Sequence, residues 1–241
     1  MARRPPSRPT RSSRDSSREP RPSAPPPTND REKIIAAFLS LLVDKPFEQI
    51  GLADVAKEAR VSLIQLREQF ASTISILAAH VKAIDRVVLS QDFSDMADEP
   101  PRERLFDVLM RRLEIMAPHR EAVRSLLRSA RRNPPLALAL NGMGVRSQQW
   151  MLAAADIGAS GPRGVVRAQG LALIFASVLR TWIRDDDPGL ARTMADLDRA
   201  LGRGQRLLGL VEDLCRIPRR LCRLRPRRRP RGDDSEDAVA A

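Results

Sequence analysis

The sequence predicts an all-α protein, and three features of the chain support this fold class. Apolar residues recur every three or four positions through most of residues 30–224, which is the spacing of one face of an α-helix. No segment alternates apolar and polar residues for long enough to indicate a β-strand. Proline, glycine and capping residues stand between the periodic segments, where helices are expected to begin and end.

Four short helices are expected in the first part of the chain, over residues 31–45, 52–59, 62–70 and 75–89. Asp30 is a suitable N-cap for the first of them. Pro46 ends that helix, because the residue before a proline is disfavoured in the helical conformation. Ser62 is a suitable N-cap for the third helix.

Longer helices are expected after a polar stretch, over residues 101–117, 118–133, 134–156, 165–183, 188–201 and 204–224. Pro101, Pro118 and Pro134 each stand where a helix is expected to start, and a proline is tolerated there because its missing N–H has no partner to lose. A turn with two glycines and a proline, IGASGPRG, precedes the helix at 165–183.

The positive charge of the chain is concentrated at its two ends. The formal net charge is +12, but residues 1–30 hold a net +4 and residues 216–241 a net +5, so only +3 is left for the residues between. Residues 1–29, rich in Pro, Ser and Arg, and residues 225–241 are expected to be disordered tails. The first tail is either merely solvated or binds phosphate, on DNA or on anionic lipid.

Membrane and secreted proteins do not fit this composition. The first twenty residues contain no apolar stretch, so no secretory signal is expected. No uninterrupted apolar run approaches the roughly 18 residues that a membrane span needs. Two cysteines are too few for a disulfide scaffold and indicate a reducing compartment, so a cytoplasmic location is expected.

Enzyme and metal-site motifs are not found in the sequence either. His80 and His119 lie 39 positions apart, and His80 falls on the apolar face of its expected helix. Cys215 and Cys222 do not have a metal-ligand spacing and cannot bridge within an intact helix. The acidic run 185–187 is explained as charge at a helix start. The chain is therefore predicted not to be an enzyme, and neither a cofactor nor a metal ion is expected.

Residues 52–70 have the layout of a helix-turn-helix, with two short helices separated by residues 59–61. An apolar core is expected to hold the angle between them, and it consists of Val55, Ala56, Val61, Leu66 and Phe70. The second helix then presents its other face to the major groove of DNA, which is wide enough for one helix. The predicted DNA-contacting residues are Ser62, Leu63, Ile64, Gln65, Arg67, Gln69 and Thr73, with Gln65 and Gln69 as the candidates for reading bases.

Residues 31–81 resemble the N-terminal DNA-binding domain of the TetR family of bacterial repressors. The resemblance is carried by the apolar first helix, Phe47, Asp54-Val55-Ala56, Val61-Ser62, Phe70, Ser72 and Leu77. It implies a TetR-like fold, with a three-helix helix-turn-helix domain at 30–90 and a helical ligand-binding and dimerisation domain at 101–203. It also implies a homodimer that represses transcription from operator DNA and is released by a small ligand.

The chain departs from the family pattern at four positions that bear on DNA binding. Arg60 stands in the turn where the family usually has Gly, and Gly51 stands where a Thr is common. Arg67 replaces an aromatic residue that contacts the DNA backbone, and Thr73 replaces a Lys that meets a phosphate. Arg67 can make a charged phosphate contact, and Thr73 a weaker neutral one. Residues 31–88 carry eight basic and seven acidic residues, so the expected DNA-binding surface is almost neutral.

Large apolar side chains in the C-terminal part are candidates for lining a pocket for a small apolar ligand. They are Met110, Met116, Met143, Trp150, Met151, Phe175 and Trp182. At helical spacing the same residues are also explained as ordinary core. Small residues in the helix at 165–183 permit the close packing that the resemblance implies for a dimer interface.

A second hypothesis comes from residues 102–127, which are similar to the helical domain of TetR-like lipid-binding proteins that assist ubiquinone biosynthesis. That resemblance is carried by Arg104-Leu105, Asp107, Arg112-Leu113-Glu114 and Pro118-His119-Arg120-Glu121. It implies the same fold without operator recognition, an isoprenoid ligand and a helix that lies on a membrane surface. The basic amphipathic helix expected at 204–224 suits an anionic membrane interface. Alternatively, its apolar stripe packs on the helical domain or on a dimer partner.

Overall fold

The protein folds as a set of packed helices, seen in a computed structural model that describes residues 30–96 and 98–221, with side chains through Arg206 except that of Ser94. Within these residues there are nine α-helices and no strand, so the predicted all-α class is confirmed. The α-helices are α1 Asp30–Asp44, α2 Leu52–Ala59, α3 Leu63–Gln69, α4 Thr73–Leu89, α5 Pro101–Met116, α6 Arg120–Ala130, α7 Pro134–Ala154, α8 Gly161–Trp182 and α9 Ala191–Leu221. Short 3-10 helices lie at Phe47–Gln49, Ser94–Met96 and Ala117–His119. The two predicted tails lie outside the described residues.

Helix starts follow the capping chemistry of the sequence. Ser62 Oγ accepts a hydrogen bond from the backbone N–H of Gln65 at 3.2 Å, and Asn133 Oδ1 accepts one from Leu136 at 3.0 Å. Ser72 Oγ accepts from the backbone N–H of Ser75 at 3.2 Å, so α4 begins two residues before the expected position. Each cap satisfies an N–H that the first helical turn leaves without a partner.

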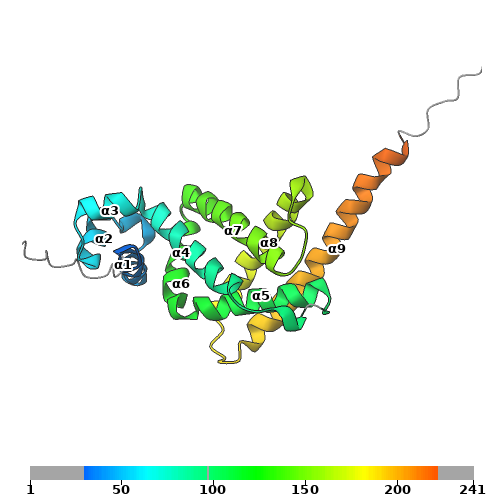
Figure 1. Ribbon diagram of the computed structural model, residues 1–241, viewed down its shortest axis with the longest axis horizontal. Coiled ribbons are helices and arrows are strands. Elements are labelled where there is room, and N and C mark those ends of the chain that lie inside the picture. Colours follow the sequence, from blue (N-terminus) through cyan, green and yellow to red (C-terminus); the bar gives the residue numbers. More distant parts are fainter. Residues whose placement is uncertain (1–29, 97, 222–241) are drawn as a thin grey trace, which may run out of the picture.

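Two apolar cores lie along the molecule, and α4 contributes to both. The N-terminal core contains α1, α2, α3 and the first half of α4, together with Ala122 and Leu126 of α6 and Leu136 of α7. The C-terminal core contains the second half of α4 with α5, α7, α8 and α9. Figure 1 shows α4 leading from the helices around α3 into the centre of the molecule. Helix α4 therefore connects the N-terminal core with the C-terminal core.

The last two helices expected from the sequence form one continuous helix, α9. No break occurs between residues 201 and 204 because the two glycines there weaken a helix without interrupting its hydrogen bonds. Gly204 also has a packing role, since a Cβ at this position would lie 2.6 Å from Ile174 Cδ1 of α8. Figure 1 shows the C-terminal part of α9 projecting away from the other helices. The side chains of the predicted amphipathic stripe from Leu207 onward lie outside the described side chains.

The start of α9 explains the acidic run as the sequence predicts. Asp187 Oδ2 accepts a hydrogen bond from the backbone N–H of Ala191 at 3.1 Å. Asp185 Oδ2 accepts from the backbone N–H and the hydroxyl of Thr193, at 2.8 and 2.6 Å. The hydrogen bonds from Thr193 hold the pKa of buried Asp185 below its usual value. The acidic side chains therefore cap the helix, which begins at residue 191 rather than 188.

Helix α8 is long and apolar enough to cross a membrane by length and composition, although the sequence contains no uninterrupted apolar run of that length. One such helix is weak evidence for a membrane span, because core helices of globular proteins meet the same criterion. In this fold α8 packs against α7 and α9 and buries Leu171, Phe175, Val178 and Trp182 in the C-terminal core. We therefore describe it as a core helix.

Candidate nucleic-acid interface

The turn between α2 and α3 has the geometry of a Schellman motif. The backbone N–H of Val61 donates to Ala56 O at 3.0 Å, and that of Arg60 donates to Lys57 O at 3.2 Å. Arg60 takes the left-handed conformation, with φ 55° and ψ 40°, in which glycine is the favoured residue. The turn thus keeps its usual backbone shape although an arginine stands at the glycine position.

The predicted core of the helix-turn-helix is present. Val55, Ala56, Leu66 and Phe70 are buried in the N-terminal core, and Val61 packs against them while half-buried. The guanidinium of Arg31 on α1 lies 4.7 Å from the centre of the Phe70 ring, on its face. These contacts hold α2 and α3 at a defined angle on α1.

The helix-turn-helix also rests on the C-terminal part of the chain. The backbone N–H of Phe47 donates to Ser129 Oγ of α6 at 3.1 Å, and Asn133 Nδ2 donates to Glu48 Oε1 at 3.1 Å. Ala122 and Leu126 of α6 add apolar contacts to the N-terminal core. Helix α6 is therefore in direct contact with the N-terminal core that carries α2 and α3.

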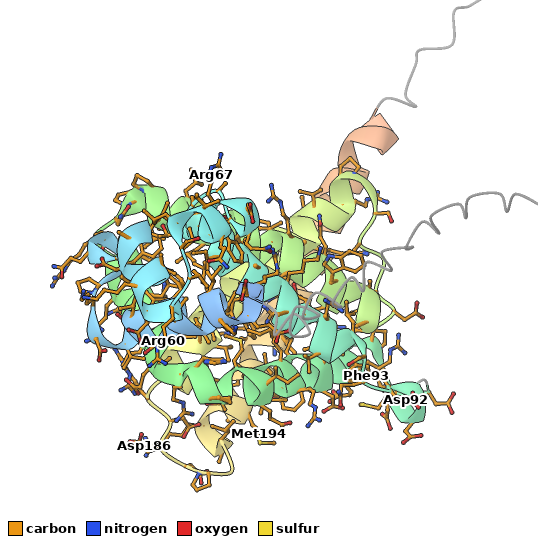
Figure 2. The ribbon with its side chains drawn as sticks, turned by 60° about the vertical axis from the view of Figure 1, so that its left-hand side comes forward. Arg60, Arg67, Asp92, Phe93, Asp186 and Met194 are labelled. Carbon is orange, nitrogen blue, oxygen red and sulfur yellow. The ribbon has the colours of Figure 1, made fainter. Side chains whose placement is uncertain are left out.

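The outer face of α3 exposes the side chains that the sequence predicts for DNA contact. Leu63 is 57% and Ile64 73% exposed, although both are large and apolar. Gln65, Arg67 and Gln69 are also exposed. Figure 2 shows the Arg67 side chain pointing away from the molecule. An exposed pair of large apolar residues beside polar ones is typical of a surface that contacts a partner.

Gln65 and Ser62 have a structural role that limits their part in recognition. The Gln65 side-chain oxygen accepts a hydrogen bond from the backbone N–H of Ser62 at 2.8 Å, and Ser62 Oγ accepts from the backbone N–H of Gln65. This reciprocal pair is a capping box that fixes the start of α3. Gln65 therefore points back along its helix, and its oxygen is already used.

Thr73 is the first residue of α4 and is half-buried next to the end of α3. Ser72 and Ser75 cap this helix, and Ser75 Oγ accepts hydrogen bonds from the backbone N–H groups of Ala71 and Ser72 at 3.1 and 3.0 Å. The N-terminus of a helix favours an anion, because its first N–H groups carry partial positive charge. The Thr73 position is thus suited to a phosphate contact without the charge of a lysine.

The side chains predicted to line an apolar ligand pocket are divided between the two cores. Met143 packs against the N-terminal core, whereas Met110, Met116, Met151, Phe175 and Trp182 belong to the C-terminal core. Trp150 is 59% exposed. The burial of Met116, Met151, Phe175 and Trp182 agrees with their interpretation as core residues. Helical spacing alone does not show which core a side chain joins.

A buried polar cluster that the sequence analysis missed lies within the C-terminal core. Asp85 of α4 accepts hydrogen bonds at Oδ1 from the Arg112 guanidinium of α5 and from Ser147 Oγ of α7, the latter at 2.7 Å. Gln148 is also fully buried, and its side-chain oxygen has no hydrogen-bond partner among the described residues. The Arg112 guanidinium lies over the Phe175 ring at 5.4 Å. A signal was available, because Asp85 falls among the apolar positions of the α4 face.

The two histidines that the sequence separates by 39 positions are in contact. Their rings pack edge to face with centroids 4.9 Å apart, His80 on α4 and His119 at the end of the 3-10 helix before α6. Burial, with smaller contributions from His119 and Arg112, lowers the pKa of His80 to about 4. Burial also lowers the pKa of His119. The pair is an edge-to-face packing contact between α4 and the segment that leads into α6. The described residues contain no cluster of three or more potential metal ligands.

Comparison with solved structures identifies the fold. The structure is similar to that of a TetR transcriptional regulator from Nitrosomonas europaea ATCC 19718, with 20% identity, a TM-score of 0.55, and coverage of 73% of this chain and 97% of that one. It is also similar to a TetR transcriptional regulator from Rhodococcus sp. RHA1, with 21% identity, a TM-score of 0.52, and coverage of 73% and 95%. No family model and no curated protein matches the sequence. The chain thus has the fold of TetR-type regulators.

Proposed function

We propose that this chain, with its TetR-type fold, is a transcriptional regulator that binds operator DNA through α3. The observation that carries the proposal is the outer face of α3, where exposed Leu63 and Ile64 adjoin Arg67 and Gln69. Caps at both ends of α3 and the buried core beneath it fix the position of this helix. A rigid short helix of this kind is what the major groove accepts. Residues 30–90 form the DNA-binding unit in this proposal, and residues 101–203 the regulatory unit.

Each exposed side chain of α3 has a chemical role in the proposal. Leu63 and Ile64 contact the methyl groups of thymine, which are the apolar features of the major groove. Gln69 is the principal candidate for hydrogen bonding to a base edge, because the Gln65 oxygen is used in the capping box. Arg67 and Thr73 contact phosphates and position the helix without reading sequence.

A homodimer is part of the proposal. Val166 and Leu173 lie seven residues apart on α8, and both are more than half exposed beside Val165. Large apolar residues exposed along one helix favour burial against a second copy. A two-fold dimer would place two α3 helices on half-sites about one helical turn of DNA apart, roughly 34–36 Å.

The position of α4 supports the proposal that a ligand regulates DNA binding. Its first turn lies next to α3, and Asp85 near its other end is tied to α5 and α7 within the C-terminal core. A small ligand that displaces α4 in this core would shift α3 relative to the DNA, so ligand binding and DNA binding would be coupled. We propose release of DNA by a ligand, repression in its absence, no enzymatic role, and a cytoplasmic location.

The test is a titration of the full chain against DNA from its own upstream region, with random DNA as competitor. The variant Gln69→Ala should reduce the preference for the upstream DNA over random DNA by about tenfold, which corresponds to the loss of one base contact. Arg67→Ala should weaken binding to both DNAs and lower the salt dependence by about one phosphate contact. Gln65→Glu serves as a further probe, because glutamate preserves the capping box while it repels DNA.

The matched control is Arg86→Ala, which removes an exposed arginine near the other end of α4. It should leave binding to both DNAs unchanged. Equal affinity for upstream and random DNA, insensitive to Arg67→Ala and Gln69→Ala, would contradict the proposal that α3 recognises an operator.

A further inference from the structure

A groove between α5 and α9 is lined by arginines and lies outside the helix-turn-helix. Its volume is about 550 Å³, and the residues that line it are Arg102, Asp196, Asp198, Arg199, Gly202, Arg203 and Arg206. In Figure 1, α9 and α3 are at opposite ends of the molecule. The groove is therefore a separate feature from the surface proposed to contact DNA.

The lining of the groove contains four arginines and two aspartates, so positive charge is in excess. Asp198 Oδ1 accepts a hydrogen bond from Arg102 Nη2 at 2.5 Å, and Asp196 Oδ2 accepts one from Thr181 Oγ1 at 2.7 Å. Arg199, Arg203 and Arg206 are exposed and form no ion pair with any of the described residues. The groove consequently keeps an excess of positive charge after its internal contacts are made.

The three unpaired arginines share one face of α9. They are spaced by four and then three residues, so their guanidinium groups are neighbours on the helix surface. Like charges at this spacing repel one another and destabilise a helix. An anion held between them would remove that repulsion, which is a physical reason for a ligand at this place.

Arg102 stands across from this face and is held in position. Its two terminal nitrogens contact Glu103 and Asp198, and its Nε is buried without a hydrogen-bond partner among the described residues. Gly202 of α9 lies directly beside it, since a Cβ there would be in ordinary van der Waals contact with Arg102 Nη2 at 3.6 Å. Arginines from two helices thus border the same space.

We propose that this groove binds a phosphate group. Guanidinium groups are donors only, and they match the geometry of oxyanions with paired hydrogen bonds. Phosphate offers three or four acceptor oxygens to arginines that approach from both sides, whereas a carboxylate offers two. The phosphate belongs either to a small phosphorylated molecule or to a lipid headgroup. The inference rests on the groove alone and is independent of operator recognition.

The experiment measures binding of inorganic phosphate and of pyrophosphate to the full chain by calorimetry, with potassium chloride replacing the probe at equal ionic strength. The groove variant is Arg199→Gln with Arg203→Gln. The matched control is Arg131→Gln with Arg163→Gln, which removes two exposed arginines outside the groove. We expect saturable binding of at least one probe that is about tenfold weaker in the groove variant and unchanged in the control.

A second arm distinguishes the source of the phosphate. Vesicles of phosphatidylcholine with and without phosphatidic acid are mixed with the wild type and both variants. Binding to the acidic vesicles that the groove variant loses assigns the groove to a headgroup, and binding of the soluble probes alone assigns it to a small molecule. The proposal is overturned if none of the probes binds saturably, or if the groove variant binds them as tightly as the wild type does. Helix content and melting in chloride verify that the groove variant is folded.

Discussion

The buried pair Asp85–Arg112 provides a stringent test of the C-terminal core. Asp85 is 7% and Arg112 4% exposed, so each charge depends on the other for stabilisation. Asp85→Leu keeps the shape of the side chain but leaves the Arg112 guanidinium buried without a counter-charge. Removal of one partner from a buried pair typically costs about 3–5 kcal/mol. We expect a loss of this size for Asp85→Leu and for Arg112→Met.

The double variant Asp85→Leu with Arg112→Met should behave differently. Replacing both charges by apolar side chains removes the desolvation penalty together with the attraction, so the loss should be no more than about 1–2 kcal/mol. The two single losses should therefore not add, and the coupling free energy should be several kcal/mol. Urea unfolding at pH 7, followed by circular dichroism, measures the free energy of unfolding of each variant.

The neighbouring pair Arg111–Glu114 is the control for this experiment. Its side chains are about half exposed and its ion pair is 2.8 Å long, so solvent screens the interaction. Arg111→Met should cost less than about 0.5 kcal/mol. Additive losses in the double variant, or single losses no larger than that of Arg111→Met, would refute the conclusion that the buried pair depends on mutual compensation.

Three further predictions concern the N-terminal half of the chain. Arg60→Gly should raise the free energy of unfolding by about 0.5–1 kcal/mol, because φ is 55° there and glycine adopts this conformation without strain. Urea unfolding measures this change, and an unchanged or lower free energy of unfolding would contradict the prediction. Gly51→Ser should add only about 0.2–0.4 kcal/mol to the free energy of unfolding, because glycine is itself a tolerated N-cap. The Asp54 carboxylate already accepts from the Gly51 N–H at 3.0 Å, and a serine hydroxyl would complete the capping box. Thermal unfolding measures the change, and a lower melting temperature would argue against it. Stability should fall as pH decreases from about 6.5 towards 4, because the unfolded chain binds a proton at His80 more readily than the folded protein, whose His80 has a pKa of about 4. The pKa shift of His80 corresponds to a loss of about 3 kcal/mol in the free energy of unfolding. NMR titration of the His80 ring measures its pKa, and a value near 6.5 in the folded protein would remove the basis for this prediction.

The helix-turn-helix was predictable because its determinants are local. Ser62 caps α3 through residues three positions away, and the apolar spacing of Val55, Leu66 and Phe70 marks the buried face of two short helices. Local hydrogen bonds of this kind can be inferred from residue types and their spacing. The capping role of Gln65 could have been predicted by the same logic, because a Ser followed three residues later by Gln is the signature of a capping box.

Contacts between distant segments could not be predicted in this way. His80 and His119 pack together because α4 and the start of α6 cross, and nothing within either segment indicates that crossing. The groove between α5 and α9 likewise forms where the start of α5 meets a helix nearly a hundred residues further along the chain. For the same reason the sequence did not show that Met143 and Phe175, both predicted as pocket residues, join different cores.

The sequence by itself determined the helical class, most helix boundaries and the exposed face of α3. Apolar periodicity and capping residues act over one or two turns, so their consequences are contained in a short window of residues. Only the tertiary structure decided which buried charges pair, which histidines meet and which arginines line a groove. The tertiary structure also decided that α9 is continuous, because Gly204 lies where the helix packs closely against α8. Those outcomes depend on the directions in which whole helices pack, and packing directions are a property of the assembled core.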